Sequence, residues 1–260
     1  MNGVPSRADL SVFDLVAALK LEPELRRWRR DGLRPKIWWR DDDARHPTPA
    51  LDRLLSAAAG RPLALAVIPN PQLDLLAARL ALASNVQVGQ HGVDHVNKSQ
   101  PGAEPSEYAP TAGAGEIAQA IAAARTGFVE AGLAPHFFTP PWNACQPGLD
   151  AALSACGFDR LSAGPHQPAD AQLSYAPSDV DLLRWRGGPR FRGSSRIAAA
   201  LANALRWRRR AGAWGEPVGL LTHHLVHDEP TWRFLDWLTR FADRHFDWVG
   251  LNEPAPLTAT

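Results

Sequence analysis

Residue types that bind metal ions follow three stretches of this sequence that are typical of β-strands. They are Asp41, Asp42 and Asp43 after residues 36–40, His91 and His95 after residues 86–90, and His223 and His224 after residues 218–221. Carboxylates grouped in a half-buried place repel one another unless a cation lies among them. Carboxylates and imidazoles are common ligands of divalent metals. The pattern therefore indicates a metal site at the strand ends.

The acidic triplet allows two interpretations. Side chains alternate along an extended segment, so Asp42 would point to one side and Asp41 and Asp43 to the other. A strand end relaxes this alternation and lets two of the three converge on one site. The alternative is a solvated loop whose carboxylates cap the helix that follows Pro47. Because an apolar aromatic strand precedes the triplet, we weigh the functional interpretation equally with the solvated loop.

The histidine pair His91 and His95 has a spacing that places two imidazoles on one face of a helical turn, within reach of one ion. Such a pair is not rare by chance, so alone it is weaker evidence than in combination with the triplet. Two histidines and one carboxylate leave coordination positions open for water and substrate. The combination predicts a catalytic type of metal site.

The histidines His223 and His224 follow four apolar residues. One of them could act as a general acid or base near neutral pH. The alternative is a polar cap on the helix that begins at Glu229. The rigid aromatic stretch 137–143 either forms a pocket wall or is only a proline-rich turn, and its spacing favours neither.

Strand and helix patterns alternate along the chain. Strands are expected to start near residues 36, 63, 86, 136, 158, 182, 218 and 247. Alternation of this kind predicts parallel strands with right-handed crossovers. We predict an α/β fold: an irregular β/α barrel of seven or eight strands, similar to a TIM barrel, in a single domain 1–260. Residues 1–35 would be a helical segment packed on the barrel, and an open doubly wound sheet is the alternative.

The composition restricts the function classes. The 260 residues include 45% hydrophobic types and carry a formal net charge of +1, which gives no global field for nucleic acid or membrane. The two cysteines make no disulfide framework. No apolar run approaches the roughly 20 residues of a spanning helix, and the N-terminus lacks a secretory signal pattern. We expect a soluble, cytoplasmic protein; the basic tryptophan-containing runs 26–30 and 206–210 leave nucleic-acid or phosphate binding as a minor alternative.

The order of these motifs resembles the polysaccharide deacetylase family, metal-dependent carbohydrate esterases related to chitooligosaccharide deacetylases. The family's Thr-Phe-Asp-Asp-Gly, His-x3-His, proline-rich, Asp/Trp and Leu-x-His motifs have counterparts across residues 36–228. The matching stretches are 40–44, 91–95, 139–142, 181–185 and 221–223. The resemblance implies an irregular β/α barrel, in agreement with the alternation of elements.

Roles follow from this resemblance position by position. It implies Asp42 as the catalytic base, with Asp41 as the alternative, and His223 as the general acid, with His224 as the alternative. It implies Asp43, His91 and His95 as the metal ligands. Three positions depart from the family: Asp41 replaces an aromatic residue, Ala44 a glycine, and Thr139 the arginine that holds the base, a role for which Arg40 is a candidate.

The function that we expect is hydrolysis of an N-acyl group, most simply acetyl, from a small-molecule carbohydrate or a sugar-like amide. The default ion is Zn²⁺, although Fe, Co or Ni suit the same ligands. The expected substrate-binding residues are Pro141, Trp142, Asn143, Trp185 and His224. The alternatives are a non-catalytic metal- or carbohydrate-binding protein with a degenerate deacetylase site and a non-haem iron oxygenase.

Overall fold

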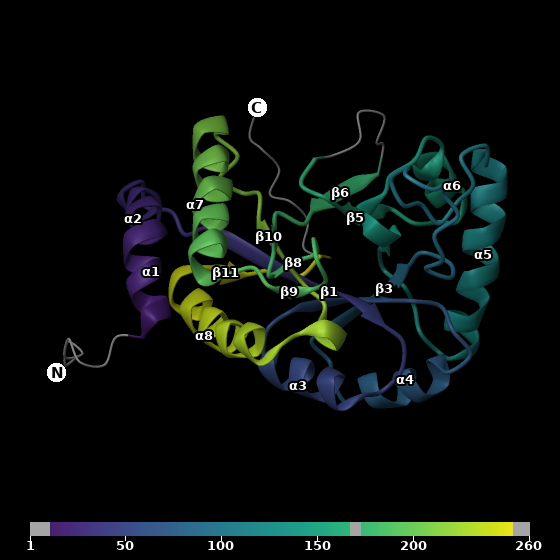
Figure 1. The fold of residues 1–260 in the computed structure, drawn as a ribbon, viewed down its shortest axis with the longest axis horizontal. Coiled ribbons are helices and arrows are strands. Elements are labelled where there is room, and N and C mark those ends of the chain that lie inside the picture. The colour runs from purple at the N-terminus through teal and green to yellow at the C-terminus, as the bar shows by residue number, and fades with distance from the viewer. Residues whose placement is uncertain (1–10, 167–172, 252–260) are drawn as a thin grey trace.

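A computed structural model describes residues 11–166 and 173–251 of the chain (Figure 1). Its main sheet is entirely parallel and has the order β6-β5-β4-β3-β2-β1-β10-β7, with β11 beside β1. These strands are β1 (Lys36–Ala44), β2 (Leu63–Val67), β3 (Val86–His91), β4 (Phe138–Thr139), β5 (Arg160–Ala163), β6 (Ser174–Pro177), β7 (Val180–Asp181), β10 (Val218–Thr222) and β11 (Asp247–Trp248). The carboxyl ends of all the paired strands therefore meet at one edge.

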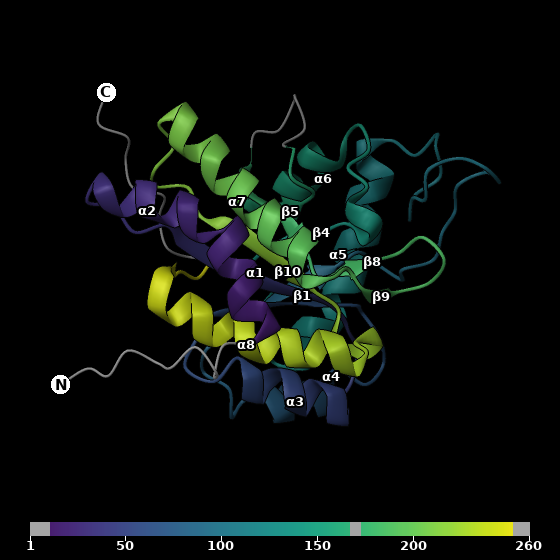
Figure 2. The same ribbon diagram turned by 60° about the vertical axis from the view of Figure 1, so that its left-hand side comes forward.

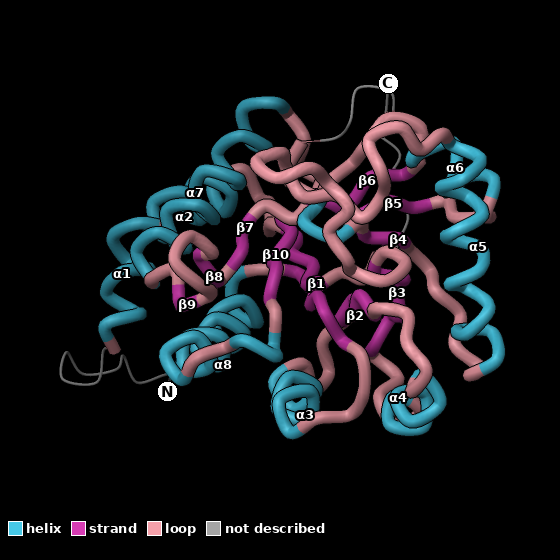
Figure 3. The backbone as a smooth tube through the Cα atoms, turned by 45° about the vertical axis from the view of Figure 1, so that its right-hand side comes forward, coloured by secondary structure: helices cyan, strands magenta, loops and turns pink. Residues whose placement is uncertain are grey.

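The sheet curls because its two outermost strands are consecutive in the chain. Only Ser178 and Asp179 separate β6 from β7. The Ser178 N–H donates to the Ala163 carbonyl of β5 at 2.9 Å, and the Asp179 N–H donates to the Gly219 carbonyl of β10 at 2.9 Å. This one segment thus bridges both ends of the sheet, and Figure 3 shows the strands curving around a common interior. The predicted irregular β/α barrel is confirmed.

One predicted strand is wrong. The sequence predicts a strand of the sheet that starts near residue 182. The Leu182 N–H does donate to the Leu221 carbonyl of β10 at 3.1 Å, but the next residues leave the sheet and form a small antiparallel hairpin, β8 (Leu183–Arg184) with β9 (Arg190–Phe191). Gly187 and Gly188 have positive φ values of 78° and 92° and reverse the chain between the two strands. The strands that complete the sheet here, β6 and β7, come earlier in the sequence.

Helices cover the outside of the barrel. They are α1 (Val12–Lys20), α2 (Glu22–Arg30), α3 (Pro49–Ala57), α4 (Leu73–Leu80), α5 (Ala114–Glu130), α6 (Leu149–Ala155), α7 (Ser194–Ala211) and α8 (Glu229–His245), with short 3₁₀ turns η2 (Pro141–Asn143) and η3 (His224–Val226). Thr48 caps α3 by accepting a hydrogen bond from the Leu51 N–H at 3.0 Å, with Pro49 at the first helical position.

The N-terminal helices α1 and α2 pack on this helical layer. Figure 2 shows α1 lying between α7 and α8. The Phe13 ring of α1 lies 5.2 Å from the Phe234 ring of α8, and Trp28 of α2 lies 4.9 Å from Trp214. Pro23 stands in the first turn of α2, where its missing N–H costs no hydrogen bond.

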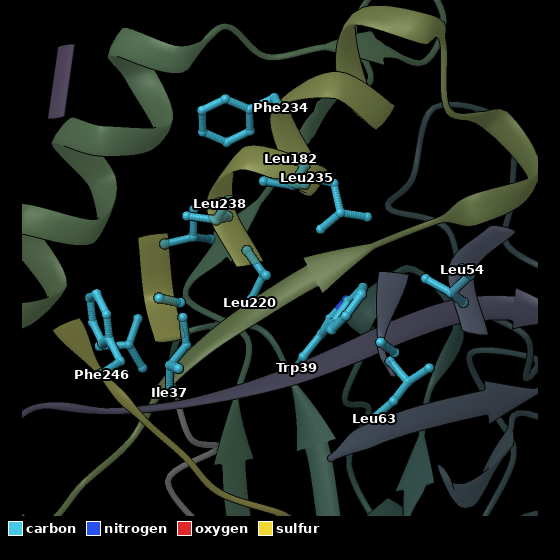
Figure 4. Packing of buried hydrophobic residues seen from close by; sticks show 14 of the residues in the cluster. Ile37, Trp39, Leu54, Leu63, Leu182, Leu220, Phe234, Leu235, Leu238 and Phe246 are labelled. Carbon is cyan, nitrogen blue, oxygen red and sulfur yellow. The ribbon is translucent and has the colours of Figure 1, made fainter. Parts of the chain in front are cut away.

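Alternate residues of β1 bury two different cores. Ile37 and Trp39 face outward with Leu220 of β10 toward α8, where Leu235 and Leu238 pack (Figure 4). The residues of β1 between them face the barrel interior. The same strand continues into the acidic triplet at its carboxyl end.

The barrel interior is filled by two aromatic side chains. Trp38 and Phe137 are almost fully buried there and pack against Ala64 and Ala66. A Cβ at Gly89 would lie 2.3 Å from the Phe137 ring, so only glycine leaves this ring its place. Above the aromatic layer, toward the carboxyl ends of the strands, the buried residues become polar.

Candidate metal centre and active site

Three side chains from two strand ends converge as the sequence predicts. Asp43 Oδ1 lies 3.2 Å from His91 Nε2 and 3.3 Å from His95 Nε2. One ligand atom from each of the three residues lies within 4.8 Å of the other two. Two ligands about 2.1 Å from one tetrahedral ion would be about 3.4 Å apart. Asp43 Oδ1 is also buried without a hydrogen-bond partner. The donor set therefore fits a divalent metal with open coordination positions.

A local irregularity in β1 turns Asp43 toward the histidines. Its φ is +72°, and the register between β1 and β2 shifts between Asp41 and Ala44. An ordinary strand would send Asp42 and Asp43 to opposite faces. The irregularity cancels this alternation, so both carboxylates can face the same end of the barrel.

The two histidines come together through an irregular turn and not through the helical turn that their spacing predicts. His91 is the last residue of β3, and residues 92–95 form an irregular turn. Gly92 and His95 have φ values of +64° and +57°, a conformation that an α-helix excludes. His91 Nδ1 donates to the Thr139 carbonyl at 2.9 Å. Because that nitrogen carries the proton, Nε2 of the neutral ring presents its lone pair to the cluster.

The Asp43 carboxylate is held ionised. Burial would raise the pKa of Asp43, but the imidazoles of His91 and His95, in their protonated form, outweigh burial and hold the pKa well below its usual value. Burial also opposes the charged form of His91, yet the Asp43 and Asp42 carboxylates raise the pKa of that imidazole above 6.5. The negative potential of the carboxylates therefore favours a positive charge in this site.

Asp42 is fixed by a fully buried arginine. Arg40 Nε lies 2.8 Å from Asp42 Oδ1, and Arg40 Nη2 donates to Asp42 Oδ2 at 3.0 Å. Arg40 has no exposed surface. It also donates to Ser162 Oγ of β5 at 2.7 Å and to Asn143 Oδ1 of η2 at 2.8 Å. One guanidinium therefore links the Asp42 carboxylate of β1 to β5 and to η2, and holds it in a fixed orientation.

His223 lies on the other side of Asp42. Its Nε2 is 3.9 Å from Asp42 Oδ2, and its Nδ1 is 4.0 Å from Asp181 Oδ1. Trp185 Nε1 donates to Asp181 Oδ2 at 2.8 Å, and the Trp185 ring lies 4.6 Å from the His223 ring. Burial raises the pKa of Asp181, with Asp42 adding to the rise and His223 opposing it. Asp181 has no role among the sequence predictions, although the stretch 181–185 is part of the resemblance.

His224 and Asp41 form a separate buried pair beside the site. Asp41 accepts hydrogen bonds from the Thr222 hydroxyl at 2.6 Å and the His224 N–H at 3.1 Å. Burial would raise the pKa of Asp41, but the His224 imidazole and these hydrogen bonds hold it below its usual value. Of the two alternatives for the base, Asp42 therefore faces His223, and Asp41 is engaged by His224.

The predicted substrate-binding residues divide into two groups. Trp142 and Trp185 are 38% and 47% exposed and flank the site, because Trp142 lies 4.7 Å from the His95 ring and Trp185 lies beside His223. Pro141, which precedes Trp142, is buried. Asn143 and His224 have a polar atom engaged within the protein, by Arg40 and Asp41 respectively. The two tryptophans are the exposed surfaces available to a bound molecule.

Glu107 is a residue that the sequence predictions missed. It lies in the long connection between β3 and α5 and is only 2% exposed. Its carboxylate accepts hydrogen bonds from the turn that carries His95. No sequence signal links it to that turn, because an acidic residue in a loop is ordinarily solvated.

A cavity of about 650 Å³ lies at the opposite end of the barrel. Lys36 and Arg160, which begin β1 and β5, line it together with Trp38. Among the described residues, the Asp43, His91 and His95 group alone has ligand atoms placed for a metal ion. No helix in the described ranges is both long and apolar enough to span a bilayer. The candidate metal site therefore lies at the carboxyl ends of the strands.

Comparison with known proteins identifies the fold. No family model and no curated protein matches the sequence. Among solved structures, a family 4 carbohydrate esterase from Streptomyces lividans in complex with acetate is similar, with a TM-score of 0.54 and 14% identity over 85% of this chain and 95% of that one. A family 4 pseudoenzyme from Bacillus anthracis has a TM-score of 0.53 and 14% identity over 84% of this chain and 64% of that one.

A third similar structure is the Bc1960 peptidoglycan N-acetylglucosamine deacetylase in complex with a naphthalenyl N-oxidanyl-benzamide. Its TM-score is 0.51, with 14% identity over 83% of this chain and 86% of that one. At these identities the similarity establishes the fold. The resemblance predicted from the sequence is thus confirmed at that level: the chain has the fold of the family 4 carbohydrate esterases, as a divergent example of it.

Proposed function

We propose that this protein is a metal-dependent hydrolase that removes an N-acyl group, in the first instance acetyl, from a small-molecule carbohydrate or a sugar-like amide. The observation that carries the proposal is the position of Asp42 and His223, whose Oδ2 and Nε2 atoms lie 3.9 Å apart, next to the group formed by Asp43, His91 and His95. One fold neighbour, a peptidoglycan N-acetylglucosamine deacetylase, supports the substrate class.

The proposed metal ligands are Asp43, His91 and His95, with Zn²⁺ as the default ion and Fe, Co or Ni as alternatives. A bound divalent ion would polarise the acyl carbonyl and make a water molecule more acidic. The open positions of a three-ligand site leave room for both groups.

The proposed base is Asp42. Its carboxylate would take the proton of the attacking water. Arg40 holds both carboxylate oxygens, so the orientation of Asp42 is set before substrate binds. Preorganisation of this kind lowers the barrier because no side chain must be ordered during the reaction.

The proposed acid is His223, which would protonate the departing amine. An imidazole can carry a proton near neutral pH. Asp181 lies toward Nδ1 at 4.0 Å and would orient the ring, while Nε2 faces Asp42 and the reacting groups. Trp185 holds the second oxygen of Asp181, so the pair His223 and Asp181 is supported from the protein surface.

The proposed oxyanion donor is the Trp142 N–H. Pro141 has no N–H, and the Asn143 N–H donates to the Pro140 carbonyl at 3.0 Å. Among the described residues the Trp142 N–H makes no hydrogen bond. Its φ of +56° belongs to an unusual turn next to His95. A donor left free beside the metal group suits the negative charge that develops on a carbonyl oxygen.

The test measures bound metal and acetate release from N-acetylated chitooligosaccharides. The wild type should contain one divalent ion and release acetate, and His91→Ala should lose both. His136→Ala is the matched control, because His136 is exposed and precedes β4 at the far end of the barrel. Full acetate release by a metal-free His91→Ala protein would end the proposal.

The alternative function is a non-catalytic protein that binds metal or carbohydrate. The observation behind it is Thr139, which stands where the resembling family has an arginine. A metal-loaded wild type that binds chitooligosaccharides but releases no acyl group from a broad panel would select this alternative.

A further inference from the structure

The carboxylate of Glu107 is buried against the turn that carries the metal ligand His95. Glu107 Oε1 accepts hydrogen bonds from the backbone N–H groups of Val93 at 2.8 Å, Asp94 at 2.7 Å and His95 at 2.5 Å. Oε2 also accepts from the Val93 N–H at 2.8 Å. Three consecutive donors thus point at one carboxylate. Such an arrangement satisfies a buried negative charge without a cationic partner.

Gly92 provides the space for this carboxylate. A Cβ at Gly92 would lie 2.3 Å from Glu107 Oε2 and 2.5 Å from Oε1. The φ of Gly92 is +64°, which also favours glycine. Glycine at position 92 is therefore needed for the Glu107 carboxylate to bind the turn, because any larger side chain there would overlap Glu107.

The turn needs such a constraint because its conformation is unusual. His95 has a φ of +57°, a value that non-glycine residues rarely adopt and keep only where surrounding contacts hold them. His95 is the metal ligand that follows this turn, whereas His91 is held independently by β3 and by the Thr139 carbonyl. Loss of the Glu107 contacts would therefore release one ligand of the three.

We infer that Glu107 is a positioning residue for the metal centre, which fixes His95 by binding the backbone of residues 93–95 through the space left at Gly92. The inference rests on the metal site of the proposed function. Glu107 also anchors the connection from 96 to 113 to the site. The next residue, Tyr108, is 6% exposed and holds the same connection to a core cluster with Ile117.

The test compares cobalt binding in Glu107→Ala, Gly92→Ala and the double variant. Each single variant should weaken Co²⁺ affinity by about 10- to 100-fold, the usual effect of removing a partner that orients a ligand. The double variant should bind Co²⁺ no more weakly than the weaker-binding of the two single variants, because both substitutions disrupt the same contact between Glu107 and the turn. At saturating Co²⁺, the visible absorption spectra of all three should shift toward that of His95→Ala.

Two control variants come from the same loop. Glu104→Ala removes an exposed carboxylate, and Gly102→Ala places a side chain at a positive φ of 85° in open space. Both should bind Co²⁺ like the wild type. Thermal unfolding of the metal-free variants identifies any that fail to fold. If Glu107→Ala does not fold, Glu107→Gln is used in its place. Its amide N–H would face the Val93 N–H, and Co²⁺ affinity should fall at least about threefold.

Unchanged cobalt affinity in Glu107→Ala, or in Glu107→Gln where only this variant folds, overturns the inference. Additive losses in the double variant overturn it as well. A wild type that binds Co²⁺ normally and releases no acetate contradicts the proposed function and leaves the role of Glu107 standing. A wild type that binds no divalent metal refutes both.

Discussion

Asp41 Oδ1 and His224 Nδ1 lie 2.5 Å apart in a pair that is almost fully shielded from solvent. Asp41 belongs to the end of β1 and His224 to the turn after β10, so the pair joins the two chain segments that carry Asp42 and His223. A one-residue offset thus separates two partnerships: Asp41 with His224 is internal, and Asp42 with His223 faces the site. The first pair joins the two segments directly beside the residues of the second.

Replacing Asp41 with Asn should destabilise the protein by about 3 kcal/mol, because His224 would remain buried without a counter-charge. Urea unfolding of metal-free wild type and Asp41→Asn measures the difference. An equal free energy of unfolding in the two proteins would show that the pair contributes nothing to stability.

This difference should depend on pH in a defined direction. The pKa of Asp41 is lowered from 3.8, so its contribution is present above that value and is lost as the pH falls through the folded pKa. The pKa of His224 is raised from 6.5: burial opposes the rise, but Asp41 outweighs it. Its contribution is present below 6.5 and is lost as the pH rises through the folded pKa. The stability difference should therefore be largest between about pH 4 and pH 6.5.

Arg40→Lys should lower kcat/KM about 100-fold, since lysine cannot hold both oxygens of Asp42 and small errors of placement are costly. Metal affinity should change little, because Arg40 contacts none of the proposed ligands. The double variant Arg40→Thr/Thr139→Arg returns the arginine to the position of the resembling family and should recover part of the activity that Arg40→Thr loses. Arg61→Lys, which alters a surface pair with Asp243, is the control.

No recovery in that double variant would mean that the guanidinium works only from β1, where it also contacts Ser162 and Asn143. Activity of Arg40→Lys equal to wild type would remove Arg40 from the proposed mechanism altogether. Circular dichroism of each variant separates these outcomes from unfolding.

Metal affinity should fall as the pH is lowered. The imidazoles must be deprotonated to bind an ion, and the pKa of His91 in the metal-free protein is raised above 6.5, with burial opposing and Asp43 and Asp42 causing the rise. Competition titrations with a chelating dye between pH 5.5 and 8 should show a weakening of up to about tenfold per pH unit in the acid range. A pH-independent affinity would contradict ligation by His91.

The sequence was sufficient to predict which strand ends bring the candidate metal group together. Parallel strands bring their carboxyl ends to one edge of the sheet, so Asp43 and His91 were expected at the same edge, although β2 lies between β1 and β3. The route of His95 could not be predicted, because the spacing fits a helical turn and the positive φ of a histidine leaves no mark in the sequence. Glu107 is separated from His95 by a loop without periodicity, and only the folded chain reveals that Gly92 makes room for it.

Trp142→Ala should raise KM for chitooligosaccharides about tenfold and change kcat little. The ring is 38% exposed beside His95 and contacts none of the proposed acid or base groups. Covering roughly 50 Å² of apolar ring surface contributes about 1.3 kcal/mol, which corresponds to that factor. Trp207→Ala is the matched control, because Trp207 is 59% exposed on α7, away from the site. A fall in kcat with unchanged KM would instead place Trp142 in the chemical step. The reason would be that loss of the ring disturbs the backbone at its φ of +56°, and with it the Trp142 N–H that is the proposed oxyanion donor.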